Sequence, residues 1–281
     1  MINQPTPEQL AVLSPIERFG YKIADWTNRT VKMPLIWWNR TFMFFIIWLC
    51  LGRRLKVHHL ERIQHLDSDS RIILAANHRT FFDFFVITWV NYTFTQMPKR
   101  IFFPVRSTFF YDRTIGIVLN FIMGAYSMFP PIMREKEKKP FNAYALQRIT
   151  EELEDQGVIV GFHPEGTRNK DPDHTKLLPA RAGVGEVIRN TPKATTIPVF
   201  IAGPTNRVVR EFFVNWFAAK KNPVVVYYGA PIETQSFMEF ESNRELHQKI
   251  ANHCMTHIQD LSEEYRIEYE DIYPILKRNQ A

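Results

Sequence analysis

The chain contains few of the residues on which covalent catalysis and metal binding depend. Only two of its 281 residues are cysteines, Cys50 and Cys254, and they lie far apart in the sequence. Two distant cysteines do not make a disulfide framework, so we expect a reducing environment that faces the cytosol. There is no G-x-S-x-G turn for a serine nucleophile. His253 and His257 are four residues apart, but no H-E-x-x-H pattern and no third ligand accompany them, so we expect no metal site.

A signal sequence, internal repeats and nucleic-acid recognition motifs are missing too. The residues before Ile16 have neither the basic start nor the apolar core of a secretory signal, and we expect a loose lead-in there. The formal net charge of +6 favours anionic partners such as phospholipid surfaces and phosphorylated substrates. Nucleic acid is the least favoured anionic partner, because none of its usual recognition motifs is present, and we predict that the protein does not bind it.

Long apolar runs are scarce, and the best one is too short to cross a bilayer alone. Residues 41–52 would make a helix of roughly 18 Å, against a hydrocarbon core of about 30 Å. Adding residues 34–38 reaches spanning length only by placing Asn39 and Arg40 in the membrane, which is costly for the charged side chain. We favour a re-entrant or interfacial anchor over residues 34–52; a packing helix covered by protein and a single span are the alternatives. The tryptophans expected near the headgroups are Trp37, Trp38 and Trp48.

What the chain does contain is a cluster of polar side chains at the end of an apolar run. Residues 72–76 are continuously apolar, as in a strand buried on both faces, and Asn77 and His78 follow directly. Ligands of α/β sheets usually bind at this end of a strand. Asp83 comes five positions after His78, so the two meet only if His78 lies in a turn and Asp83 on the first turn of the next helix.

In that arrangement the carboxylate of Asp83 would hold one imidazole nitrogen as a donor. The other nitrogen of His78 would then be a general base toward a hydroxyl group. The alternative is that His78 only caps a helix and that Asp83 complements the helix dipole.

A second polar cluster follows the apolar residues 158–160. It reads Phe-His-Pro-Glu-Gly-Thr-Arg and ends at Arg168. Gly166 allows the backbone to approach a ligand closely, and the planar guanidinium of Arg168 suits a phosphate.

The two clusters, in this order along the chain, resemble the glycerolipid acyltransferases of the lysophosphatidate acyltransferase type. The resemblance implies His78 as the base, Asp83 as its partner and Asn77 as a supporting residue. It implies that the stretch Glu165, Gly166, Thr167 and Arg168 binds the phosphate of the acceptor.

Two further blocks extend the resemblance. One begins at Gly124 and departs from the family's pattern, because residues 129–133 intervene before the basic residue Arg134, which it implies as a second phosphate ligand. The other is an apolar stretch at residues 197–200, in which Pro198 would shape the wall of the pocket.

The function implied is acyl transfer from a thioester, acyl-CoA or acyl carrier protein, to the free glycerol hydroxyl of a lysophospholipid. Lysophosphatidate is the expected acceptor and phosphatidate the product; acyl-CoA or acyl carrier protein is a co-substrate, and no cofactor is expected. The alternatives are a different lyso-lipid or glycerol phosphate as acceptor, or a non-catalytic membrane protein that binds lipid. Acceptor head group, acyl-chain length, donor carrier and oligomeric state stay open.

The alternation of strand and helix patterns predicts an α/β fold, with a central mixed sheet flanked by helices. We expect a membrane-associating segment over residues 1–54, a catalytic domain over 55–235 and a C-terminal helical extension over 236–281. The protein is expected on a phospholipid membrane, with its catalytic domain facing the cytoplasm. Residues 208–221 are predicted to be either a second membrane-facing patch or a core helix.

Overall fold

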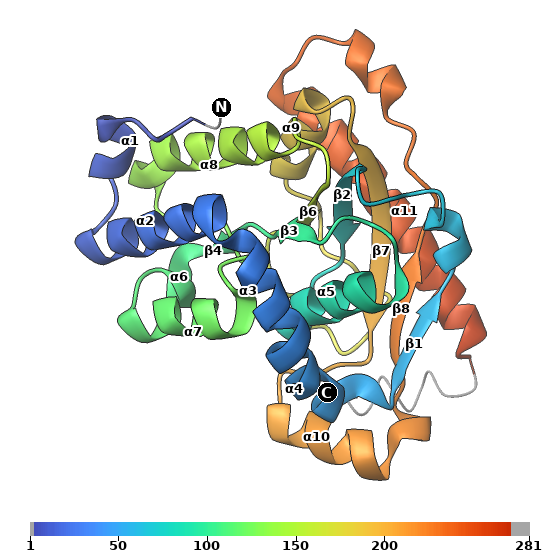
Figure 1. Ribbon diagram of the computed structural model, residues 1–281. Helices are drawn as coiled ribbons and strands as arrows, with labels where there is room; N and C mark the ends of the chain where they lie inside the picture. The colour runs from blue at the N-terminus through green and yellow to red at the C-terminus, as the bar shows by residue number, and fades with distance from the viewer. Residues whose placement is uncertain (1–2, 271–281) are drawn as a thin grey trace.

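The structure of the protein is a computed structural model, which describes residues 3–270. Its centre is a six-stranded sheet with helices on both faces (Figure 1). Neighbouring strands are parallel, except that β7 and β8 are antiparallel, so the predicted mixed α/β sheet is confirmed. In spatial order the strands are β1 (Leu55–His58), β8 (Val224–Tyr228), β7 (Thr195–Ala202), β2 (Arg71–Ala76), β6 (Val158–Phe162) and β3 (Arg100–Phe102).

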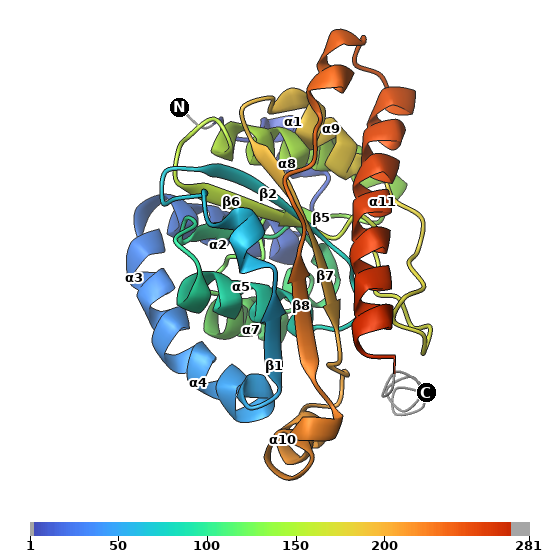
Figure 2. The ribbon, with the colours of Figure 1, turned by 90° about the vertical axis from the view of Figure 1, so that its right-hand side faces the viewer.

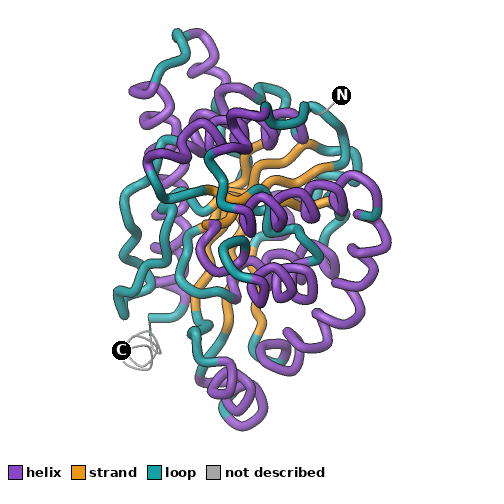
Figure 3. The backbone as a smooth tube through the Cα atoms, turned by 90° about the vertical axis from the view of Figure 1, so that its left-hand side faces the viewer, coloured by secondary structure: helices purple, strands orange, loops and turns teal. Residues whose placement is uncertain are grey.

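The sheet is buried on both faces because alternate side chains of its strands enter two separate cores. Ile73 and Ala75 of β2 belong to the core on one face, and Ile72 and Leu74 belong to the core on the other. Figure 3 shows the strands as a twisted layer between the helices. The residues of β2 are therefore continuously apolar because both faces of this strand are buried, as the sequence predicted.

Different helices cover the two faces (Figure 2). One face carries α8 (Lys139–Glu152), α9 (Gly183–Asn190) and α11 (Arg244–Glu268). The other carries α5 (Phe82–Phe94) and the long helix near the N-terminus. Buried Ile250 and Leu261 of α11 pack in the same core as Phe200 of β7, so this helix is the cover of one sheet face. The division of the chain at residues 55 and 235 stays a prediction.

Residues Lys32–Gly52 form one continuous helix of 21 residues, which we call the anchor helix. It comprises α3 (Lys32–Trp38), a π-helical turn (Asn39–Met43), α4 (Phe44–Ile47) and a second π-helical turn (Trp48–Gly52). By length and composition alone it could cross a membrane. One side of it is buried against the domain, and that side includes Asn39, whereas Arg40 is exposed. The helix thus continues through Asn39 and Arg40, the two polar residues that a membrane-spanning segment would have to place in the bilayer.

The remaining elements surround this frame. The residues that were expected to be a loose lead-in contain the short helix α1 (Pro7–Ala11), whose N-cap Thr6 forms a capping box with Gln9. Helix α2 (Pro15–Thr30) begins in the same way at Ser14. The other helices are α6 (Ser107–Phe110), α7 (Thr114–Gly124) and α10 (Val208–Phe217). Strands β4 (Val105–Arg106) and β5 (Pro131–Ile132) form a separate parallel pair, and 3-10 turns occur at Leu60–Ile63, Lys136–Lys138, Ala219–Lys221 and Gln235–Glu239.

A buried ion pair fixes α10 to the start of β1. The guanidinium of Arg54 pairs with the carboxylate of Glu211, and both side chains are fully buried. The same carboxylate accepts a hydrogen bond of 2.6 Å from the hydroxyl of Thr205. A charged group in this position is tolerated only while its partner is present.

We therefore expect Glu211→Ala to destabilise the protein by about 3 to 5 kcal/mol, because it leaves the charge of Arg54 buried without its counter-ion. Denaturant unfolding followed by circular dichroism measures the change. The control is Glu245→Ala, which removes an exposed ion pair with Lys249 and should cost less than about 0.5 kcal/mol. Equal losses in the two variants would contradict the role given to the buried pair.

Candidate active site

The expected contact between His78 and Asp83 is present. His78 lies in the turn after β2, and Asp83 is on the first turn of α5. His78 Nδ1 is 2.9 Å from Asp83 Oδ2. Because a carboxylate is only an acceptor, Nδ1 carries the proton, and Nε2 is left with its lone pair.

The turn that contains His78 also surrounds the carboxylate of Asp83. Its Oδ2 accepts hydrogen bonds from the backbone N–H groups of Arg79 (2.7 Å) and Thr80 (2.9 Å), and its Oδ1 accepts one from the Thr80 hydroxyl (2.8 Å). Burial by itself would raise the pKa of Asp83, but the hydrogen bond and charge of His78 and the backbone donors hold that pKa below its ordinary value. The carboxylate therefore stays ionised and orients the imidazole.

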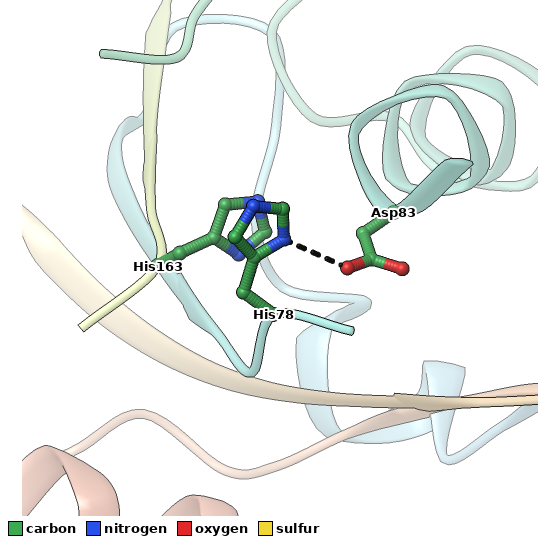
Figure 4. A group of neighbouring side chains, drawn as sticks. All are labelled: His78, Asp83 and His163. Carbon is green, nitrogen blue, oxygen red and sulfur yellow. Dashed lines mark hydrogen bonds and ion pairs between the residues drawn. The ribbon is translucent and has the colours of Figure 1, made fainter. Parts of the chain in front are cut away.

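His163 lies against one face of the His78 ring (Figure 4). The two ring centroids are 3.9 Å apart and the planes differ by 6°. Nδ1 of His163 lies 3.0 Å from the carbonyl oxygen of Ala76 and 3.1 Å from that of Asn77, so this nitrogen also carries a proton. Burial, together with the charge of His78, lowers the pKa of His163 to about 3, which keeps this ring neutral.

His78, Asp83 and His163 bring three potential metal-ligand atoms within 4.8 Å of one another. The two rings are nearly parallel, however, so their in-plane lone pairs run side by side and do not meet at one point. Both Nδ1 atoms are also hydrogen bonded, to Asp83 and to backbone carbonyls. This arrangement suits proton transfer better than chelation of an ion.

Glu165 holds the backbone of His78. One carboxylate oxygen accepts a hydrogen bond of 2.5 Å from the His78 N–H, and the other accepts one of 2.8 Å from the Leu178 N–H. The side chain is buried, and this burial raises the pKa of Glu165. The resemblance implied Glu165 as a phosphate-binding residue, but both of its oxygens face backbone donors inside the loop. Glu165 therefore connects the turn that contains His78 to the loop that contains Leu178.

Asn77 extends the pairing of β2 with β7 beyond the end of β2. Its amide donates to the carbonyl of Ile201 (2.9 Å) and accepts from the N–H of the same residue (2.7 Å). The side chain is fully buried. Asn77 thus acts as a supporting residue that fixes the strand end from which His78 projects.

Arg168 lies on the surface at the same edge of the sheet. Its Nη1 is 3.3 Å from Asn206 Oδ1, and the same oxygen accepts a hydrogen bond of 3.0 Å from the N–H of Phe81. Asn206 therefore links Arg168 to the residue that precedes α5. Gly166, two residues earlier, has a φ of 63°, a left-handed conformation that favours glycine, and Thr167 between them is partly buried.

A comparison with known protein families agrees with this geometry. The family model described as Acyltransferase matches residues 54–202, which is more than half of the chain. The chain belongs to the glycerolipid acyltransferase family. No curated protein matched the chain in a direct search. The family match supports acyl transfer in general, and the matched span contains His78, Asp83 and Arg168.

Two further residues that the resemblance implied in this acyltransferase come from other parts of the fold. Arg134 is exposed and follows β5, which belongs to the separate two-stranded sheet, and its backbone N–H donates to the Glu135 carboxylate. Pro198 is buried within β7, beside Ala75 of β2, and its carbonyl accepts a hydrogen bond of 2.9 Å from Gly229. Pro198 thus lies where β8 separates from β7, and its place in a pocket wall stays a prediction.

Four residues of the site were not identified from the sequence. They are Arg79, Thr80, His163 and Asn206. Arg79 is buried and donates hydrogen bonds to the carbonyls of Asp171 and Asp173, which ties the loop after Arg168 to the His78 turn. A polar residue directly after a buried strand was the available signal for His163, which follows β6, whereas Asn206 comes four residues after the end of β7.

The low pKa of His163 predicts a dependence of stability on pH. Below about pH 6.5 the unfolded chain binds a proton at this residue and the folded protein does not, so acid favours unfolding. Between pH 7 and pH 5 we expect wild type to lose about 1 to 2 kcal/mol more than His163→Phe, which keeps a ring at this position. Urea unfolding at both pH values measures the difference. The other titrating groups are common to both proteins, and parallel losses would show that His163 is protonated in the folded state.

Proposed function

We propose that this acyltransferase transfers an acyl chain from a thioester to the free glycerol hydroxyl of a lysophospholipid. Coenzyme A or acyl carrier protein carries the donor, lysophosphatidate is the acceptor, and phosphatidate is the product. The observation that carries the proposal is the Nδ1–H of His78 held at 2.9 Å by the buried carboxylate of Asp83, which leaves Nε2 as a base. The family match supports the acyl-transfer step.

The reaction needs one proton transfer in each direction. Nε2 of His78 takes the proton of the acceptor hydroxyl, and the oxygen attacks the thioester carbonyl. The tetrahedral intermediate collapses with cleavage of the C–S bond, and the imidazolium of His78 returns the proton to the leaving thiolate. Asp83 stabilises the imidazolium during these steps. A thioester is already activated, so positioning and proton transfer are sufficient without a cofactor, a metal or an acyl-enzyme.

Arg168 is the proposed ligand of the acceptor phosphate. Its guanidinium is exposed, and Asn206 connects it to Phe81, three residues after His78. A planar guanidinium can bind two phosphate oxygens at once. Gly166 and Thr167 are proposed as supporting donors, and Arg134 as a second cation.

The anchor helix is the proposed attachment to a phospholipid membrane, with the catalytic domain on the cytoplasmic side. Its inner side packs in the core with Phe85 of α5, so its whole length lies along the domain. Its outer side exposes five large apolar residues, Met33, Trp37, Phe42, Phe45 and Trp48. A helix that is apolar outward and packed inward fits an interfacial position in one leaflet.

A second candidate acceptor is another lyso-lipid or glycerol phosphate. The departure of the block around Arg134 from the family's pattern favours it, because residues 129–133 intervene before this cation. The base and the donor chemistry would be unchanged. A non-catalytic protein that binds lipid is the alternative outside the enzyme class.

We expect the purified protein, in detergent or liposomes, to acylate lysophosphatidate from labelled acyl-CoA or acyl carrier protein. His78→Ala should lower kcat about a thousandfold, because it removes the general base. The control is His65→Ala, an exposed histidine outside the site, which should retain wild-type activity. If only a different lyso-lipid gave product, that lipid would be the acceptor in place of lysophosphatidate. Absence of transfer with every pair, from folded and membrane-bound protein, would leave the lipid-binding alternative.

The phosphate-binding role of Arg168 predicts a change in KM. Arg168→Ala should raise the KM for lysophosphatidate about tenfold or more, and Arg168→Lys should restore part of this loss, because lysine keeps the charge without the planar fork. Activity toward monoacylglycerol, which has no phosphate, should not change. Arg113→Ala, at an exposed arginine, is the control. A similar loss with both acceptors would assign Arg168 to folding or to the donor.

A further inference from the structure

Helix α10 has its polar and apolar sides reversed relative to an ordinary surface helix. Its buried residues are Glu211 and Asn215, whereas five apolar residues face outward. We call these residues the α10 face: Val208, Val209, Phe212, Phe213 and Phe217. Phe217 is 82% exposed and Val209 is 71% exposed. The core-helix alternative for residues 208–221 is therefore wrong, and an exposed apolar patch of this kind marks a contact surface.

The buried polar side of α10 binds the end of the anchor helix. Asn215 accepts a hydrogen bond of 3.0 Å from the N–H of Arg53 and donates one of 2.9 Å to the carbonyl of Leu49. The indole N–H of Trp216 donates to the same carbonyl at 3.1 Å. Carbonyl groups in the last turn of a helix have no partner within the helix, so these side chains satisfy them. These hydrogen bonds join α10 to the end of the anchor helix.

The apolar outer sides of the two helices adjoin each other. The rings of Trp48 and Trp216 meet edge to face at 5.6 Å, and Phe45 stacks on Trp48 at 6.3 Å. Figures 1 and 2 both show α4 and α10 together at one end of the molecule. The ring of Trp216 also lies 6.4 Å from that of Phe212, so the α10 face adjoins the exposed residues of the anchor helix through Trp216.

Positive charges border this surface. Arg53 lies over the ring of Trp216, at 5.1 Å from its centroid, and Arg207, Lys220 and Lys221 flank α10 in the sequence; all four are exposed. The acidic residue of α10, Glu211, is buried in its ion pair. Apolar residues bordered by cations match the interface of an anionic bilayer. A second copy of a chain with net charge +6 would bring like charges together.

We propose that the α10 face enters an anionic phospholipid bilayer beside the anchor helix. The domain is then held at the membrane by two elements that are distant in sequence. Asn206, two residues before α10, contacts Phe81 and Arg168, so this second attachment holds the phosphate-binding edge at the lipid surface. Only this last consequence rests on the proposed function; binding of the face to lipid does not require activity.

The test compares full-length proteins by flotation with phosphatidylcholine vesicles, with and without phosphatidylglycerol. The double variant Phe213→Asp, Phe217→Asp should lower the vesicle partition coefficient about tenfold or more, since it places two charges in the apolar layer. The matched control is Phe240→Asp, Ile267→Asp, at residues that are 61% and 63% exposed and lie outside the α10 face. This control should bind as wild type does, and phosphatidylglycerol should strengthen the binding of wild type.

Wild-type partitioning by the α10 variant would overturn the proposal. So would a wild-type dimer that the α10 variant converts to monomer while vesicle binding is unchanged, because a second copy would then cover the face. Acyl transfer in detergent micelles separates this question from the proposed function. The α10 variant should retain wild-type turnover there, and a wild type without activity would refute the enzymatic proposal while the flotation result still decides the role of α10.

Discussion

The buried carboxylate of Asp83 is the constraint on which the rest of the site depends. A charge inside a protein is tolerated only when hydrogen bonds replace its hydration. All of the donors described here come from the turn of residues 78–80: the His78 ring, two backbone N–H groups and one hydroxyl. The structure that makes Asp83 acceptable in the interior is therefore the same structure that orients His78. Any rearrangement of the turn would affect both the stability of the protein and the orientation of the His78 imidazole.

Three neighbouring strands hold this turn in place. His78 projects from β2, which lies between β6 and β7 in the sheet. Asn77 pairs with the backbone of β7, and His163 and Glu165, which follow β6, support the ring and the backbone of His78. Parallel strands bring their carboxyl ends to one edge, so residues far apart in sequence can support one imidazole. The orientation of the His78 imidazole depends on the sheet as much as on the turn.

The parts of the site that sequence could predict are those that depend on local spacing. His78 and Asp83 meet within one strand-to-helix turn, and an apolar run followed by polar residues is visible without knowledge of the fold. The inward orientation of Glu165 depends on how its loop passes Leu178, which no local pattern determines. The position of Pro198 depends on the register of β7 against β2. Asn206 belongs to the site only because β7 lies beside β2.

The same distinction applies to the N-terminal segment. Asn39 and Arg40 look like a break when the whole segment is measured against a bilayer. In the structure one side of the helix contacts protein, so Asn39 is buried against the domain while Arg40 is exposed. Composition averaged along a segment does not reveal such a division between its two sides. The sidedness of the helix appears only when its contacts with the domain are known.

The polar side of α10 also determines how far the domain can be separated from its N-terminal region. Asn215 and Trp216 bond to the backbone of Leu49 and Arg53, and Trp48 packs against Trp216. A shortened protein that starts after Gly52 would lose Trp48 and Leu49 and expose the polar groups beside an already apolar surface. Removing the hydrophobic helix to obtain a soluble enzyme would therefore remove part of the enzyme's own scaffold. The anchor helix is an internal component of the folded domain.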